Sequence, residues 1–129
     1  MTEAGLKFIQ NMMDGLSIPY DFMEWKARPP EEPTPDRYHI GEPQEMPTVT
    51  MEEDGMEETN FILRGFTRSD WALLWGDARK IKKNLPQTAI LPDGTGIAVF
   101  YEGSRAVMTA DNALKSIKTN LKIKEWSVN

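Results

Sequence analysis

The stretch "SIKTNLKIKEWSV", residues 116–128, alternates apolar and polar side chains over most of its length. Successive side chains of a β-strand point to opposite faces of a sheet, so the alternation predicts a strand over about 114–126 with one buried and one solvated face. The expected buried positions are Ile117, Thr119, Leu121 and Ile123, and the expected solvated positions are Lys118, Asn120, Lys122 and Lys124.

A helix is predicted by "SDWALLWGDARKIKKNLP", residues 69–86. Ser69 is the expected N-cap, basic residues gather at the negative end of the helix dipole, and Pro86 ends the helix. An apolar stripe with spacings of three and four residues is formed by Trp71, Leu74, Trp75, Ala78, Ile81 and Leu85. We expect Trp71 and Trp75 to lie in the core, and the alternative is a pocket for a partner protein.

Shorter elements complete the pattern. An N-terminal helix follows from the spacing of Leu6, Ile9, Met12, Met13 and Leu16, with Gly15 as its expected left-handed end. Strands are predicted over 18–26, 37–40, 59–67, 88–91 and 96–102, the last two as a hairpin around the turn "PDGTG". Residues 104–113 are expected to form a loop.

This order of elements favours an α+β fold in which a mainly antiparallel sheet packs against two helices. A chain of 129 residues with 40% apolar composition suits a single compact domain, 1–129, with one core. Six of the nine prolines and a run of acids fall within about 28–58, where we expect proline-rich and acidic loops.

Composition excludes several classes of protein. Cysteine is absent, so disulfides, thiol catalysis and thiolate metal sites are excluded. No stretch approaches the roughly 20 apolar residues of a membrane helix, and the N-terminus lacks the features of a signal peptide, so we expect a cytosolic protein. His39 is the single histidine, and without an evident second ligand or base partner we expect it to be structural. We expect no enzyme activity, no cofactor and no metal.

Charge is polarised along the chain, whose net charge is −5. Residues 38–63 carry seven acidic and no basic side chains, whereas residues 64–129 carry eleven basic and six acidic ones. The lysine-rich face can be a nucleic-acid or partner surface or simply the solvated side of a sheet, and we favour the solvated side. At a sheet edge the lysines would also oppose unwanted strand pairing. The acidic run Glu52, Glu53, Asp54, Glu57 and Glu58 lacks calcium-loop spacing and is either a solvated loop or an interface.

Six phrases occur in order along most of the chain: "IPYDFMEW" (18–25), "YHIGEP" (38–43), "FILRGFTRSDW" (61–71), "KIKKNL" (80–85), "DGTGIAVFYE" (93–102) and "LKSIKTNLKIKEWSV" (114–128). Together they resemble small tail proteins of long-tailed phages and prophages of Gram-positive bacteria, the tail-completion or head-to-tail joining (minor tail) proteins. Two stretches, 31–43 and 103–116, depart from the pattern of that group.

The resemblance implies a non-enzymatic subunit that assembles with itself, as a hexameric ring, and with neighbouring tail or connector proteins. It implies assembly in the host cytoplasm and then a place in the virion tail, with neither membrane nor nucleic acid as a partner. We expect Glu52, Glu53 and Asp54 of one subunit to approach the basic region of a neighbour, with Lys118, Lys122 and Lys124 as candidate contacts. The alternative function is a cytosolic binding module, nucleic-acid-associated or regulatory, whose lysines meet phosphates.

Overall fold

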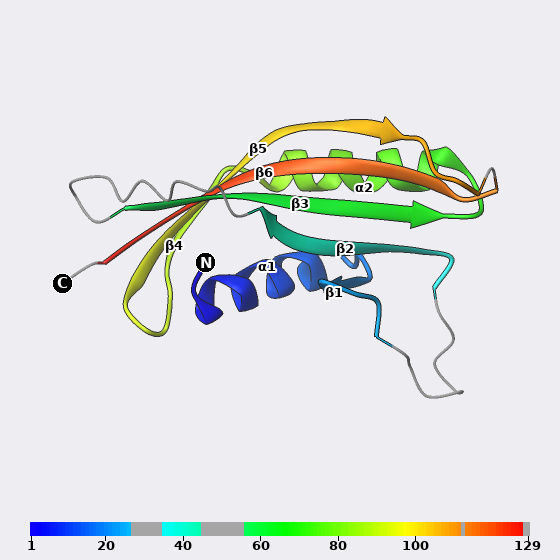
Figure 1. Cartoon of the computed structure of the whole chain (residues 1–129). Coiled ribbons are helices and arrows are strands. Elements are labelled where there is room, and N and C mark those ends of the chain that lie inside the picture. The colour runs from blue at the N-terminus through cyan, green and yellow to red at the C-terminus, as the bar shows by residue number, and fades with distance from the viewer. Residues whose placement is uncertain (27–34, 45–55, 112, 128–129) are drawn as a thin grey trace.

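The computed structural model describes residues 1–26, 35–44, 56–111 and 113–127. Two helices and six strands follow one another as α1 (Glu3–Gly15), β1 (Tyr20–Phe22), β2 (Arg37–Gln44), β3 (Glu57–Thr67), α2 (Trp71–Asn84), β4 (Gln87–Ile90), β5 (Thr95–Val107) and β6 (Lys115–Ser127). All six strands belong to one sheet in the order β1-β2-β3-β6-β5-β4 (Figure 1).

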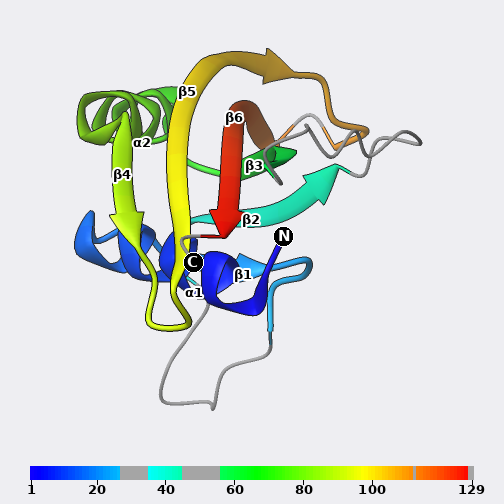
Figure 2. The same cartoon turned by 90° about the vertical axis from the view of Figure 1, so that its left-hand side faces the viewer.

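The expected class, an α+β fold with a mainly antiparallel sheet packed against two helices, is wrong. Strands make up 49% of the described residues, and the six-stranded sheet is mixed and curls into a half-barrel. Strand β1 runs parallel to β2, while the other neighbouring strands are antiparallel. Figure 2 shows β5 bending over as it passes along the sheet.

Two local features help to shape this sheet. Strand β5 has an irregularity in its pairing with β6 between Tyr101 and Gly103, and such bulges increase the bend and twist of a strand. Strand β1 is only three residues long, because Met23 adopts a left-handed backbone conformation with φ 69° that ends the extended run. The strand predicted over 18–26 is therefore much shorter than expected.

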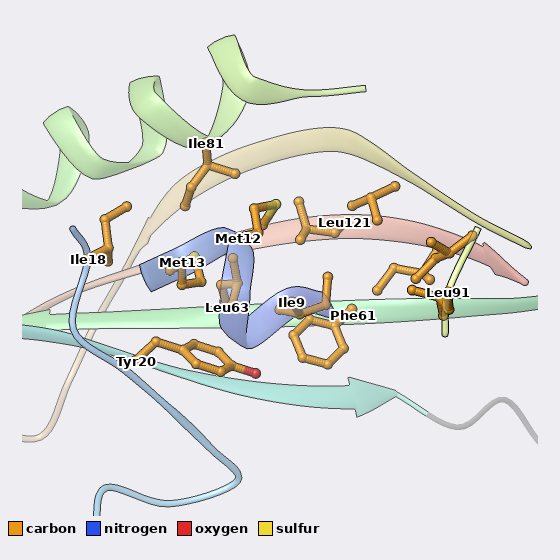
Figure 3. Close-up of a cluster of buried hydrophobic side chains, with 13 residues drawn as sticks. Ile9, Met12, Met13, Ile18, Tyr20, Phe61, Leu63, Ile81, Leu91 and Leu121 are labelled. Carbon is orange, nitrogen blue, oxygen red and sulfur yellow. The ribbon is translucent and has the colours of Figure 1, made fainter. Parts of the chain in front are cut away.

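The core lies on one face of the central strands, which we call the covered face. It carries Phe61 and Leu63 from β3 and Ile117, Leu121 and Ile123 from β6, all at most 1% exposed. Ile9, Met12 and Met13 of α1 and Ile81 of α2 belong to the same buried cluster as Phe61, Leu63, Leu121 and Ile123 (Figure 3). Ile117 packs in a smaller cluster with Leu74 and Ala78 of α2. The alternation predicted for 114–126 is therefore confirmed. The apolar side chains on one face of the strand are removed from water, as the hydrophobic effect favours.

Several predictions of local structure are confirmed at α2, β3, β6 and the hairpin of β4 and β5. Others are wrong by a few residues. Asp70, not Ser69, caps α2 by accepting a hydrogen bond from the amide of Ala72. The left-handed residue after α1 is Ser17 rather than Gly15. The loop expected over 104–113 begins later, because β5 extends to Val107.

The prediction that Trp71 and Trp75 lie in the core is also wrong. Their relative exposures are 37% and 42%. The helix instead buries Leu74, Asp77, Ala78 and Ile81. Asp77 is charged and lies on the buried side of α2. With this side toward the sheet, the two tryptophans lie at the margin of the contact between helix and sheet.

The start of α1 is fixed by a buried carboxylate from the far end of the chain. Thr2 caps the helix by accepting from the amide of Gly5 at 3.0 Å, and the amide of Thr2 donates to Glu125 at 3.2 Å. Glu125 is 3% exposed and lies on β6. A carboxylate is favourable at the positive end of a helix dipole, so this contact ties the N-terminus to the central strand.

Glycine is required where rings pack directly on the sheet backbone. A Cβ built on Gly65 of β3 would lie 2.5 Å from Cε1 of His39, and one built on Gly96 of β5 would overlap the ring of Trp126. His39 is fully buried, so its ring has little freedom to move away. Glycine at these two positions therefore allows the rings of His39 and Trp126 to lie directly against the backbone of the sheet.

We predict that Gly65→Ala destabilises the protein by about 1–3 kcal/mol, because the new methyl group overlaps the buried imidazole ring. Gly76→Ala is the matched control: it adds the same group within α2, where nothing lies within 4 Å of the new Cβ. We expect it to stabilise the helix by about 1 kcal/mol. Urea denaturation measures both changes. Equal effects of the two substitutions would contradict the close packing at Gly65.

Candidate assembly surfaces

The lysine-rich side of β6 lies on the sheet face opposite the core, which we call the open face. Strand β6 lies between β3 and β5, so the condition under which its lysines would protect a sheet edge is not met. Lys122 Nζ lies 3.6 Å from Glu102 and 3.9 Å from Glu58, and Lys124 Nζ lies 3.9 Å from Glu58. These partly exposed pairs contribute roughly 0–1 kcal/mol each, but they compensate the charge of both lysines.

Lys118 has a different environment. The strand register places it opposite Arg64 of β3 on one side and Arg105 of β5 on the other. Arg64 Nε donates to Glu42 at 2.8 Å, whereas Lys118 and Arg105 form no ion pair within the described ranges. Like charges directly opposite each other in a sheet are destabilising, so this row of three cations favours an anionic neighbour. The three predicted lysines are therefore not equivalent.

The predicted acidic half of the interface, Glu52, Glu53 and Asp54, lies outside the described residues. The next two acids of the run are described and have partners within the chain. Glu57 accepts from the N-terminal amine of Met1 at 3.2 Å, and Glu58 lies near the lysines of β6.

A second surface lies on the outer side of α2, where sequence analysis gave a partner pocket at Trp71 and Trp75 only as the alternative to a place in the core. Trp75 lines a recess between α2 and β5 together with Tyr101, and the rest of its lining is Ala78, Arg79, Lys82 and Lys83. Trp71 lines a further recess beside Met108, which is 93% exposed. Asp77 is the residue in the sequence that could have indicated this surface. It lies between Leu74 and Ile81, and an acid that is buried there with its partners shifts the buried side of the helix away from the tryptophans.

Those partners come from β2. Arg37 Nε lies 3.0 and 2.9 Å from the two carboxylate oxygens of Asp77, and His39 Nε2 lies 3.1 Å from Oδ2. Asp77 is 2% exposed and His39 is fully buried. Burial raises the pKa of Asp77, but the hydrogen bonds and charges of His39 and Arg37 outweigh it, so the pKa lies below its ordinary value.

The cluster of Arg37, His39 and Asp77 fastens α2 to β2. A structural role is expected for His39 because no acidic partner is evident in the sequence. In the structure Asp77 is that partner. Nδ1 of His39 has no hydrogen-bond partner among the described residues. A histidine and an aspartate this deeply buried cannot meet a substrate in this conformation, so their arrangement serves the position of the helix.

Among the described residues, no group of three or more metal-ligating side chains comes together. Within the same residues, neither helix combines the length and apolar character needed to cross a membrane.

The chain matches no protein-family model and no curated protein in sequence. Its fold is similar to a chain in the structure described as the virion of a native gene transfer agent particle, with a TM-score of 0.64 and 15% identity. That match covers 88% of this chain and 83% of the other. A second solved structure has a TM-score of 0.58 and 11% identity, and the match covers 100% of this chain and 99% of that one. At these identities the likeness concerns the fold.

We predict that Asp77→Asn lowers the free energy of unfolding at neutral pH by about 3–5 kcal/mol, because it leaves Arg37 without its buried counter-charge. A carboxylate whose pKa is lowered by folding stabilises the protein above its ordinary pKa of 3.8, and this contribution is lost as the pH falls through the lowered value. The free energy of unfolding of the Asp77→Asn variant should therefore fall less at acidic pH than that of the unchanged protein. Urea denaturation at a series of pH values measures this difference.

Glu102→Gln is the matched control, since Glu102 is 42% exposed and lies near Lys122. We expect it to change stability by less than about 1 kcal/mol. A similarly small effect of Asp77→Asn would show that the buried cluster does not fasten α2.

Proposed function

We propose that this chain is a structural protein of a phage-like particle, and specifically a tail-completion or head-to-tail joining protein. The observation that carries the proposal is the fold likeness over 88% of the chain to a component of a gene transfer agent virion. The ordered phrases that resemble small phage tail proteins agree with it. The chain acts through contacts between subunits rather than through catalysis, first in the host cytoplasm and then in the virion tail.

Self-assembly into a hexameric ring is part of the proposal. A ring forms when one surface of a subunit binds a different surface of the next and the rotation closes. The chain has the charge asymmetry for such a contact, with seven acids and no base in 38–63 and an excess of basic residues after it. Neighbouring tail or connector proteins are further partners at the two open sides of the ring.

Within this assembly, Glu52, Glu53 and Asp54 approach the basic region of the next subunit. Of the three lysines predicted from the sequence, Lys122 and Lys124 already have acidic neighbours in their own chain, which leaves Lys118 as the candidate receptor on the open face. A contact at Lys118 would also relieve the repulsion between it and the flanking arginines.

The role is tested by deleting the gene from the phage or prophage that encodes it. We expect separate heads and tails, or tails of abnormal length, in electron micrographs, and a plasmid copy should restore complete particles. Mass spectrometry of purified particles should detect the chain. Normal infectious particles without it would contradict the role. DNA binding by the purified protein that weakens steeply with salt would favour the binding-module alternative instead.

We predict that replacing Glu52, Glu53 and Asp54 together by lysine impairs complementation of that deletion, because the acidic side of the subunit contact becomes basic. Glu24→Lys, Asp93→Lys and Glu102→Lys in one chain is a control with the same change of net charge. Assembly is scored by the fraction of joined particles in micrographs. Full complementation by the first variant would exclude the three acids from the interface.

A further inference from the structure

Three aromatic side chains lie along the junction of α2 with β5. Trp71 and Trp75 are 37% and 42% exposed, and Tyr101 is partly buried beside Trp75. Tryptophan and tyrosine on a helix surface, next to a recess, are the residue types that most often dominate binding between proteins. The buried contacts of this helix are made by Leu74, Ala78 and Ile81, so both tryptophans lie at the margin of its contact with the sheet.

Cations continue the same surface toward the end of α2. Arg79, Lys80, Lys82 and Lys83 form no ion pair with any described residue. Arg79 and Lys83 are four residues apart on the helix, where like charges repel, although the helix dipole favours them. Lys82 Nζ lies 6.0 Å from the centre of the Tyr101 ring. The surface therefore combines an apolar recess with uncompensated positive charge.

We propose that a second copy of this chain docks on this surface through its acidic stretch "MEEDGM", residues 51–56. We call the surface the α2 seam and define it by Trp71, Trp75, Arg79, Lys82, Lys83 and Tyr101. The inference rests on the proposed self-assembly and names the surface that receives the acids.

Charge and side-chain type both match this occupant. The stretch holds three acids and no base, which complements three cations of the seam. Its two methionines are flexible apolar side chains that make favourable sulfur contacts with aromatic rings, as Trp75 and Tyr101 would provide. The described contacts of the basic row at Lys118 are strand pairing and one ion pair, and solvated charges alone add little affinity. The seam is therefore the better receptor.

The first test uses a fluorescent synthetic peptide of residues 48–56 as the probe. The receptor is the full chain with Glu52, Glu53 and Asp54 replaced by lysine, so that its own stretch does not compete. At low salt we expect saturable binding by fluorescence anisotropy. Trp75→Ala, at an exposed position that should not affect folding, is expected to weaken binding about tenfold or more.

Charge variants locate the site. Lys82→Glu with Lys83→Glu should abolish peptide binding, whereas Arg105→Glu with Lys118→Glu, the matched control on the open face, should leave it unchanged. A peptide with its acids replaced by glutamine and asparagine should bind much more weakly. No binding, or binding lost only in the open-face variant, would overturn the inference. A short DNA duplex could instead displace the peptide and lose its own binding in the same seam variants. That result would assign the seam to phosphate binding and would also overturn the inference.

The second test is a charge exchange in the full chain. Lysine at 52–54 should reduce self-association in sedimentation velocity, and adding Arg79→Glu, Lys82→Glu and Lys83→Glu should restore it. Restoration by acidic residues at Lys118, Lys122 and Lys124 instead would move the receptor to the open face. These results are separate from the gene-deletion experiment: particles that lack the chain would refute the virion role whatever the peptide does.

Discussion

The fold is organised around the burial of one face of β3 and β6, which carries Phe61, Leu63 and Leu121 and is removed from water by the two helices. These two strands are long and pair over eleven residues from Glu57 to Thr67, so the apolar surface is large. One helix cannot cover it, and side chains from both α1 and α2 enter the same cluster. Thr2 and Glu125 hold α1 in this position, and the Asp77 cluster holds α2.

Positioning α2 through Asp77 has a consequence for the surface. A helix that packed by its most apolar side would bury Trp75, but burial of Asp77 places Leu74 and Ile81 toward the sheet and leaves Trp75 at the margin. The buried ion pair contributes little net stability compared with an apolar contact, because its desolvation is costly. Its effect is on orientation, and the exposed aromatic and basic side of the helix follows from it.

Local rules predicted the elements whose signals lie within a few residues: β6 by alternation, α2 by spacing and Pro86, and the β4–β5 hairpin by its turn. The curl of the sheet and the parallel pairing of β1 with β2 depend on contacts between distant segments. The same holds for the candidate surfaces. Lys122 is compensated by Glu58 and Glu102 from two other strands, and Asp77 is buried by β2, so neither environment can be read from neighbouring residues.

The ends of the sheet bear on which surfaces remain for assembly. Its edge strands are β1, with three residues, and β4, with four, and such short edges are poor templates for adding a strand from another chain. The long strands β3 and β6 lie inside the sheet, whereas β5 pairs with β4 only over Gly96–Val99 and, among the described strands, its residues 100–107 pair on one side only, with β6. Contacts between copies through side chains have two candidate surfaces among the described residues, the open face and the outer side of α2. On the open face many of these side chains already compensate one another. On α2 the cations have no acidic partner among the described residues and adjoin an aromatic recess, and this combination supports the proposed binding of a neighbour at the helix.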